Sequence, residues 1–221
     1  RGARVVAVEP SADMLRVLAG RLADEGRQAA VEPRQATFED LSPGAGSFGV
    51  VVAAQSFHWA DPQTRWSRLA GLLAPDGVAF LCWNGWRLDP QAHDLGAVRG
   101  LYRVDGPGLV PDIDDERSLT SWAEDEIGAE PLLGETSASH YYWDWALPVD
   151  DYFTLLATTS QYAVAAPDVR ARLFEGLGRV LGAQVRLEGR TLLLTVRPST
   201  TSTRTRTRTR TRTRRGTTWP G

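Results

Sequence analysis

Short apolar runs alternate with helix-like patterns from the first residues onward. Residues 4–8 form an apolar run that ends at Glu9-Pro10, because proline cannot continue a central ladder of hydrogen bonds. Ser11 is a candidate N-cap for the helix that follows and that ends before Gly26. Four apolar residues recur at helical spacing in this stretch: Met14, Leu15, Leu18 and Leu22.

The same alternation continues beyond this helix. A weak strand is expected at 29–32, and the β-branched run at 48–54 has the pattern of a strand buried on both faces. Residues 61–73 have helical spacing, and a turn at 75–77 leads into a strand at 78–83. Strands that alternate with helices in this way predict an α/β fold with a parallel, doubly wound sheet.

The middle of the chain is less regular. Residues 84–137 are of mixed polarity and contain many Gly, Pro and Asp residues, with weak helical patterns at 92–102 and 119–127. We expect this segment to form a lid or substrate insertion over the sheet. Residues 1–83 then form a partial, Rossmann-like cofactor-binding core.

Regular patterns return in residues 138–198, which are expected to complete the sheet. An aromatic strand around His140 precedes helices at 149–158 and 167–181. His140 and Trp143 are expected to be strand and core residues rather than site residues.

The end of the chain is expected to contain a hairpin and then a disordered tail. The runs 184–187 and 190–196 predict an antiparallel C-terminal hairpin that turns at Glu188-Gly189. Residues 199–221 are mostly Thr-Arg repeats without an apolar residue until Trp219, so they cannot form a core and should be disordered.

Composition and charge narrow the function classes. A hydrophobic fraction of 42% and a charged fraction of 24% are ordinary for a globular protein, and no run approaches the roughly 18–20 apolar residues that span a bilayer. Residues 1–198 carry 18 Arg against 27 acids, so this body is acidic and suits a small-molecule enzyme better than a nucleic-acid partner. The seven Arg of the tail could contact phosphates, although dipeptide repetition is typical of low-complexity sequence.

The cysteine content and the start of the chain bear on location. Cys82 is the single cysteine; it cannot form an internal disulfide and is expected to be a buried structural thiol. Residues 1–4 run directly into an apolar strand, which is not a signal-peptide pattern. Together these features favour a reducing, cytoplasmic location.

Glu9 is the first candidate for chemistry. An acid at the end of the second strand of a doubly wound sheet lies where a nucleotide ribose binds, and its oxygens can accept hydrogen bonds from both ribose hydroxyls. The same acid occurs in nicotinamide-binding folds. A solvated Glu at a strand end is the simpler alternative.

Four segments, in matching order and spacing, carry a family resemblance. They are similar to the cofactor-binding motifs of class I S-adenosylmethionine-dependent methyltransferases. The segments are residues 7–15 (AVEPSADML), 35–41 (QATFEDL), 50–59 (VVVAAQSFHW) and 72–77 (LLAPDG). The string Ala-Gln-Ser-Phe-His-Trp-x-Asp further resembles a bacterial branch that includes trans-aconitate and ubiquinone/menaquinone-type methyltransferases. The likeness covers roughly residues 1–198.

The resemblance implies S-adenosylmethionine as the cofactor and a Rossmann-like doubly wound sheet as the fold. The resemblance implies that Glu9 binds the ribose and that Pro10 and Met14 pack beside the adenine. It also implies that Thr37 and Phe38 lie at the edge of the adenine ring and that Gln55 lies near the methionine part of the cofactor.

His58 and Trp59 would face the transferred methyl group and form part of the substrate pocket. A sulfonium releases its methyl group without acid catalysis, so such an enzyme mainly aligns the nucleophile and excludes water. His58 is then either a catalytic base for the acceptor or a neutral wall of the pocket, and the Phe-His-Trp string favours the wall. No metal is expected.

Two features depart from the family's pattern. Gly49 stands where the family has an Asp after the phenylalanine. The family's Gly-x-Gly-x-Gly loop, whose glycines let the backbone pass close to the cofactor, would fall upstream of Arg1. We therefore expect an N-terminally truncated sheet that lacks its first strand and glycine-rich loop. Such a sheet would consist of two half-sheets with unpaired inner edges.

The leading hypothesis is methyl transfer from S-adenosylmethionine to a small-molecule acceptor, impaired in this truncated chain. The alternative is a non-catalytic remnant of the same fold, either a pseudoenzyme or a fragment. The acceptor stays open, because a fold does not determine the substrate.

Overall fold

The chain forms two compact units, each described here by itself. The computed structural model describes residues 2–42, 44, 46–113, 123, 126–128, 130–199 and 210–215, the last six by their backbone alone. Unit 1 comprises Arg1–Phe80, Glu130–Glu135 and Val196–Thr205; unit 2 comprises Leu81–Ala129, Thr136–Thr195 and Arg206–Gly221. Most of the segment expected as a separate lid therefore shares one unit with most of the segment expected to follow it.

Unit 1 begins with a strand–helix–strand segment. Its elements are β1 (Val5–Glu9), α1 (Ala12–Asp24), the short 3-10 helix η1 (Gln28–Ala30) and β2 (Val31–Gln35). The two strands pair in parallel, and the register places Glu9 opposite Gln35. The helix starts where the sequence predicts, since Ser11 Oγ accepts a hydrogen bond from the backbone N–H of Met14 at 3.3 Å.

The rest of unit 1 differs in detail from the sequence-based expectation. Its elements are β3 (Phe48–Ala54), the 3-10 helix η2 (Phe57–Trp59), α2 (Arg65–Leu72) and the first half of β4 (Leu73–Leu88). The prediction that β3 is buried on both faces is wrong, because Val50 and Val52 are 55% and 67% exposed. The turn expected at 75–77 is also wrong, since these residues lie within the extended β4.

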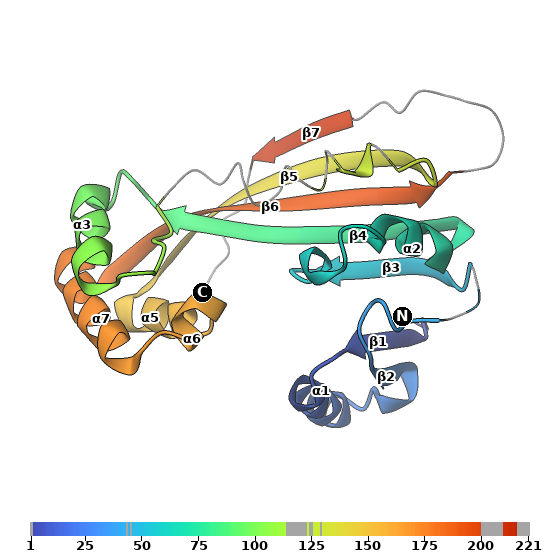
Figure 1. Ribbon diagram of the computed structural model, residues 1–221, viewed down its shortest axis with the longest axis horizontal. Coiled ribbons are helices and arrows are strands. Elements are labelled where there is room, and N and C mark those ends of the chain that lie inside the picture. Colours follow the sequence, from blue (N-terminus) through green and yellow to red (C-terminus); the bar gives the residue numbers. More distant parts are fainter. Residues whose placement is uncertain are drawn as a thin grey trace. The chain divides into compact units, whose positions relative to one another are not determined.

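Two sheets are present in the described part of the chain. β1 and β2 form one sheet, and the other has the strand order β3-β4-β6-β5-β7 (Figure 1). β1 and β3 are thus terminal strands of different sheets. Two separate sheets are what the sequence predicts, whereas their predicted cause, a truncation, stays a prediction.

Unit 2 combines long strands with several helices. Its elements are α3 (Leu95–Asp105), β5 (Leu133–Pro148), α5 (Val149–Ala157), α6 (Ser160–Ala163), α7 (Pro167–Leu181) and β6 (Gln184–Pro198). These helices gather at one end of the strands (Figure 1). α7 has the predicted bounds because Pro167 occupies its first turn and Gly182 ends it with a positive φ of 74°.

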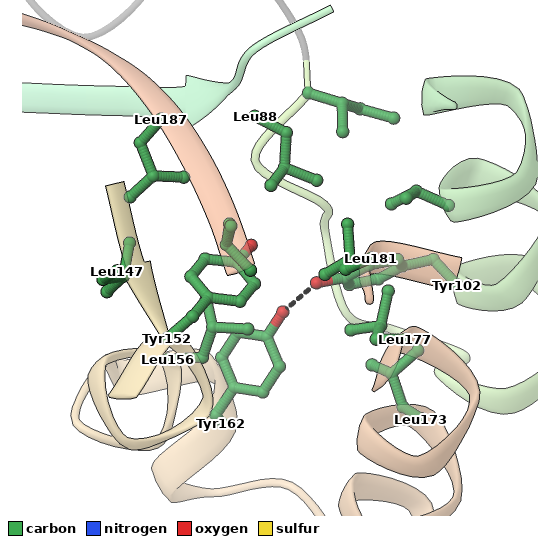
Figure 2. Packing of buried hydrophobic residues seen from close by; sticks show 13 residues of the cluster. Leu88, Tyr102, Leu147, Tyr152, Leu156, Tyr162, Leu173, Leu177, Leu181 and Leu187 are labelled. Carbon is green, nitrogen blue, oxygen red and sulfur yellow. Dashed lines mark hydrogen bonds between the residues drawn. The ribbon is translucent and has the colours of Figure 1, made fainter. Parts of the chain in front are cut away.

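The core of unit 2 is aliphatic apart from three tyrosines. Its buried members are Leu88, Val98, Tyr102, Ile113, Leu147, Tyr152, Leu156, Tyr162, Leu173, Leu177, Leu181, Val185 and Leu187. Figure 2 shows the hydroxyl groups of Tyr102 and Tyr162 joined by a hydrogen bond within this cluster. The core therefore satisfies two of its few polar atoms internally.

The predicted hairpin at Glu188-Gly189 is wrong. β6 runs without interruption through both residues, and Gly189 does not take the positive φ that a two-residue hairpin turn needs. Glu188 Oε2 accepts hydrogen bonds from Nε and Nη2 of Arg87 on β4, at 3.0 and 2.8 Å. The indole of Trp143 on β5 packs against Gly189. These cross-strand contacts keep the pair extended.

The sequence predicts disorder for residues 199–221, but this prediction is wrong for six of these residues. Arg210–Arg215 forms β7, which pairs in parallel with β5 from Ser137 to Tyr142. The Thr-Arg repeat has the two-residue period of a strand, and β-branched Thr favours extended backbone. Most other residues of the tail, and most of the helix expected at 119–127, lie outside the described residues.

Smaller expectations have mixed outcomes. His140 and Trp143 lie on β5 as predicted, both half-buried. Cys82 is a free thiol on β4, but it is half-buried rather than fully buried. Among the described residues, no helix is both long and apolar enough to cross a membrane.

Candidate functional site

The carboxyl ends of β1 and β2 bring the first candidate residues together. Glu9 Oε1 accepts a hydrogen bond from the backbone N–H of Ser11 at 2.9 Å. Gln35 Nε2 donates to the carbonyl oxygen of Pro10 at 3.2 Å and so ties the two strand ends to each other. The Glu9 carboxylate is held at the strand end with acceptor capacity to spare, because a carboxylate offers about four lone-pair sites.

Pro10 and Met14 lie on the open surface beside Glu9. Pro10 is exposed, and Met14, in the first turn of α1, is 58% exposed. Of the four apolar residues at helical spacing in α1, only Leu22 is buried. Met14 therefore does not serve the packing of α1 and is accessible to a ligand at the end of β1.

A compact turn holds Thr37 after β2. The backbone N–H and the hydroxyl of Thr37 both donate to Asp40 Oδ2, at 3.2 and 2.8 Å. The backbone N–H of Asp40 donates back to Thr37 Oγ1 at 3.2 Å. Both hydrogen bonds from Thr37 lower the pKa of Asp40, and the bond from the Thr37 side chain has the larger effect. The turn thus has a fixed shape before any ligand binds.

A carboxylate links this turn to the segment that follows β3. Glu39 Oε1 accepts a hydrogen bond from the backbone N–H of Asp61 at 2.9 Å, which is the main reason that the pKa of Glu39 is lowered. Asp61 in turn accepts from the backbone N–H of Gln63 and the hydroxyl of Thr64, at 3.0 and 2.9 Å. These two bonds lower the pKa of Asp61.

Aromatic contacts join the same two segments. The rings of Phe38 and Phe57 meet edge to face, with centroids 5.5 Å apart and an interplanar angle of 75°. Phe57 also packs on Trp66 of α2, with centroids 4.9 Å apart. Phe57 and Trp66 are 4% and 5% exposed, so they form an apolar floor under Phe38.

Gln55 marks a strained turn at the end of β3. Its φ is 51°, and it is the one non-glycine residue with a positive φ among those that the structure describes. A side chain in this conformation costs on the order of 1–2 kcal/mol. The strained residue redirects the chain from β3 into η2, which carries His58 and Trp59.

His58 and Trp59 are both exposed, Trp59 at 75%, and their rings lie 5.0 Å apart. Burial of part of the imidazole, and then the charge of Arg65, lower the pKa of His58. His58 is therefore neutral at neutral pH. A neutral imidazole suits both alternatives, a base and a wall.

The sequence-based candidates fall into two groups. Glu9, Pro10 and Met14 lie around the end of β1, whereas Phe38 contacts the segment that carries His58 and Trp59. Sequence reasoning gave no role to four residues that organise these groups: Gln35, Glu39, Phe57 and Asp61. Gln35 lies beyond the strand expected at 29–32, so the sequence offers no signal for it, and it offers none for the pairing of Glu39 with Asp61.

Comparison with known proteins shows what the segment that carries this site is similar to. Residues 1–81 match a family model described as a methyltransferase domain. This segment is thus similar to a methyltransferase domain. The matched segment contains all the residues that the sequence singled out, from Glu9 to Trp59.

Curated relatives agree with the methyltransferase domain. Uncharacterized methyltransferases of Mycobacterium bovis and Mycobacterium tuberculosis are each 33% identical to this chain over 106 residues. The aligned part is 48% of this chain and 39% of each relative. The chain thus spans about two fifths of the length of the curated relatives that it matches.

Solved structures agree with the fold. YcgJ protein of Bacillus subtilis aligns over 89% of this chain and 83% of its own, with 18% identity and a TM-score of 0.51. A candidate type II methyltransferase of Anaeromyxobacter dehalogenans aligns over 88% of this chain and 80% of its own, with 21% identity and a TM-score of 0.50. The α/β, Rossmann-like fold expected from the sequence is confirmed. The resemblance to one bacterial branch stays a prediction.

Proposed function

We propose that this chain binds S-adenosylmethionine at the carboxyl ends of β1 and β2 and in the loops after β2 and β3, for methyl transfer to a small-molecule acceptor. The observation that carries the proposal is the Glu9 carboxylate, held by the Ser11 N–H opposite Gln35. Ligands of open α/β sheets bind beyond the carboxyl ends of their strands. A ribose there can donate its two hydroxyls to Glu9.

The adenine would lie between the surface of α1 and the turn after β2. Met14 is exposed beside the ribose position, and the turn at Thr37 is already closed by Asp40. Phe38 rests on buried Phe57 and can therefore present an edge to a ring without being displaced. Preorganised groups of this kind bind a ligand with little ordering cost.

The methionine part and the acceptor would lie near Gln55, His58 and Trp59. Methyl transfer from a sulfonium needs in-line alignment and a dry site, and the exposed indole of Trp59 can supply apolar surface for both. The lowered pKa of His58 keeps its imidazole uncharged beside a cationic sulfonium. We favour the role of a neutral wall for His58.

We further propose that binding by these 221 residues alone is weak. They contain no Gly-x-Gly-x-Gly segment, and glycine is the residue that lets a backbone pass close to a cofactor. Each missing 1.4 kcal/mol of contact lowers affinity about tenfold, so an otherwise micromolar site becomes roughly millimolar when several contacts are lost. A non-catalytic member of the fold would bind as weakly and transfer no methyl group.

Titration with S-adenosylhomocysteine tests the role of Glu9. We expect Glu9→Ala to weaken binding by about 1.5–3 kcal/mol, or roughly ten- to hundredfold, the range for a charged hydrogen bond. Glu9→Asp should recover little, because the shorter side chain cannot reach both hydroxyls. Chemical-shift changes at the Ser11 and Met14 amides with millimolar ligand measure this loss, since they should be clear in the wild type and nearly absent in Glu9→Ala.

Glu32→Ala is the matched control, because Glu32 is an exposed acid on β2 whose recorded partner is Arg34, at 2.7 Å. It should leave the affinity unchanged. An equal affinity of Glu9→Ala and the wild type for S-adenosylhomocysteine would overturn the proposed ribose site.

A further inference from the structure

We infer that Glu39 is a positioning residue of this site, which with Phe38 holds the segment 57–61 and thereby sets the position of His58 and Trp59. The inference rests on the proposed function only for its consequence, which is coupling between the adenine side and the acceptor side. The contact itself is a property of the folded chain.

The first hold is the hydrogen bond from the Asp61 N–H to Glu39 Oε1, at 2.9 Å and across 22 residues of chain. Asp61 is also the start of the next element. Its carbonyl oxygen accepts from the N–H of Arg65 at 2.9 Å, and its carboxylate accepts from Gln63 and Thr64. Glu39 therefore fixes the point from which α2 departs.

The second hold is the edge-to-face contact of Phe38 with Phe57, at 5.5 Å. Phe57 is anchored on Trp66, so Phe38 packs against a ring that is itself immobilised by α2. Neighbouring residues of one turn, Phe38 and Glu39, thus contact the two ends of the segment 57–61.

His58 and Trp59 lie between these two holds. The 3-10 helix η2 has weak internal bonding: the N–H of Trp59 donates to Ser56 O at 3.0 Å, and the N–H of Ala60 donates to Phe57 O at 3.3 Å. η2 has no side-chain cap. A short segment of this kind takes its position from its anchors. A ligand that shifts the turn at 37–40 therefore acts on Trp59 as well.

Charge supports the geometry. The hydrogen bond from Asp61 lowers the pKa of Glu39, and the Thr37 side chain and the charge of Arg68 act in the same direction. Glu39 is therefore ionised at neutral pH, and a hydrogen bond to an ionised acceptor is about twice as strong as one between neutral groups.

The Asp61 amide proton tests the contact without any ligand. In the wild type its chemical shift should follow the titration of Glu39, with a midpoint below the ordinary value of 4.5. In Glu39→Gln the amide should keep a hydrogen-bond acceptor but lose the part of its titration that belongs to Glu39, so that only the effect of the Asp61 carboxyl is left. An Asp61 amide that titrates identically in the wild type and in Glu39→Gln would overturn the inference.

Trp59 tests the positioning. Its indole N–H signal, assigned with Trp59→Phe, should move in Glu39→Ala and return towards the wild-type position in Glu39→Gln, which still offers an acceptor oxygen. Glu32→Ala removes an exposed acid on the neighbouring strand β2 and should leave the Trp59 signal in place. An unmoved Trp59 signal in Glu39→Ala would show that Glu39 does not position this segment.

Ligand titration separates this inference from the proposed function. On addition of S-adenosylhomocysteine, the Trp59 signal of the wild type should shift, and the shift should fall several-fold in Glu39→Ala. If the wild type does not bind the ligand, the proposed function fails, while the two ligand-free measurements still decide the role of Glu39. If Glu39→Ala binds with an unchanged Trp59 response, the coupling is overturned.

Discussion

At the scale of single residues, Gly189 sets how closely β5 and β6 approach. A Cβ added there would overlap the indole of Trp143, whose Nε1 donates to Thr191 Oγ1 at 3.1 Å. We expect Gly189→Ala to lower the free energy of unfolding by roughly 1–3 kcal/mol, because the ring must move and strain its hydrogen bond. Urea unfolding measures this loss.

Gly20→Ala is the matched control. Gly20 lies in α1, and nothing lies within 4 Å of an added Cβ. Alanine favours a helix over glycine by up to about 1 kcal/mol, so this variant should be as stable as the wild type or more stable. Wild-type stability of Gly189→Ala would contradict the packing of Trp143 on β6.

Single residues also show which parts of the site the sequence can predict. Glu9 is readable because its strand run, the following proline and the N-cap Ser11 are adjacent in sequence, and the structure joins Glu9 to Ser11. The link between Glu39 and Asp61 spans 22 residues and follows no period. Such a contact depends on where two loops end in space, which local patterns do not encode.

At the scale of elements, local end signals decide what the sequence predicts well. α7 is predicted at both ends, since Pro167 and Gly182 mark its ends chemically. β6 is not, because Glu188-Gly189 carries a hairpin signal that cross-strand partners override. Strand length and pairing are tertiary properties, so β4 and β6 are both longer than their apolar runs suggest.

The β7 strand gives a prediction at the same scale. Parallel pairing with β7 should protect the β5 amides between Ser137 and Tyr142 that face it. Deletion of residues 200–221 should therefore speed hydrogen exchange at alternate amides of this stretch. Amides of Leu192 and Leu194 on β6 should not change, because β6 lies between β4 and β5. Equal protection before and after deletion would contradict the pairing.

At the scale of the whole chain, buried apolar surface is unevenly distributed. Among described residues 2–42, only Leu22 is fully buried, and Val5, Met14 and Val17 are 47%, 58% and 53% exposed. Unit 2 holds the large aliphatic cluster instead. Because stability follows buried apolar area, residues 2–42 should be the less stable part, and a ligand bound there should stabilise them.

Asp112 introduces a titratable carboxyl beside the core of unit 2. Burial raises the pKa of Asp112 to about 6, although the side chain of Trp86 lowers it in part. Tyr102, Tyr152 and Tyr162 face this carboxyl, and burial is the first cause that raises the pKa of each phenol. The phenols therefore stay neutral while Asp112 titrates.

The sign of the resulting pH dependence follows from proton linkage. The pKa of Asp112 in the folded chain, about 6, lies above its ordinary value of 3.8, so the folded chain binds more protons between these values. This contribution to stability is complete below about pH 4 and is lost as pH rises through about 6, in total about 3 kcal/mol. Asp112→Asn should remove the loss and exceed wild-type stability at neutral pH.

Urea unfolding between about pH 4 and pH 7, compared for the wild type and Asp112→Asn, isolates this contribution from those of other carboxyls. Asp168→Asn is the opposite control: Asp168 is exposed, pairs with Arg172 at 2.7 Å, and has a lowered pKa. The stability that Asp168 contributes is present above its ordinary pKa and is lost as pH falls, so Asp168→Asn cannot mimic Asp112→Asn. Identical pH slopes for the wild type and Asp112→Asn would show that this carboxyl is solvated in the folded chain.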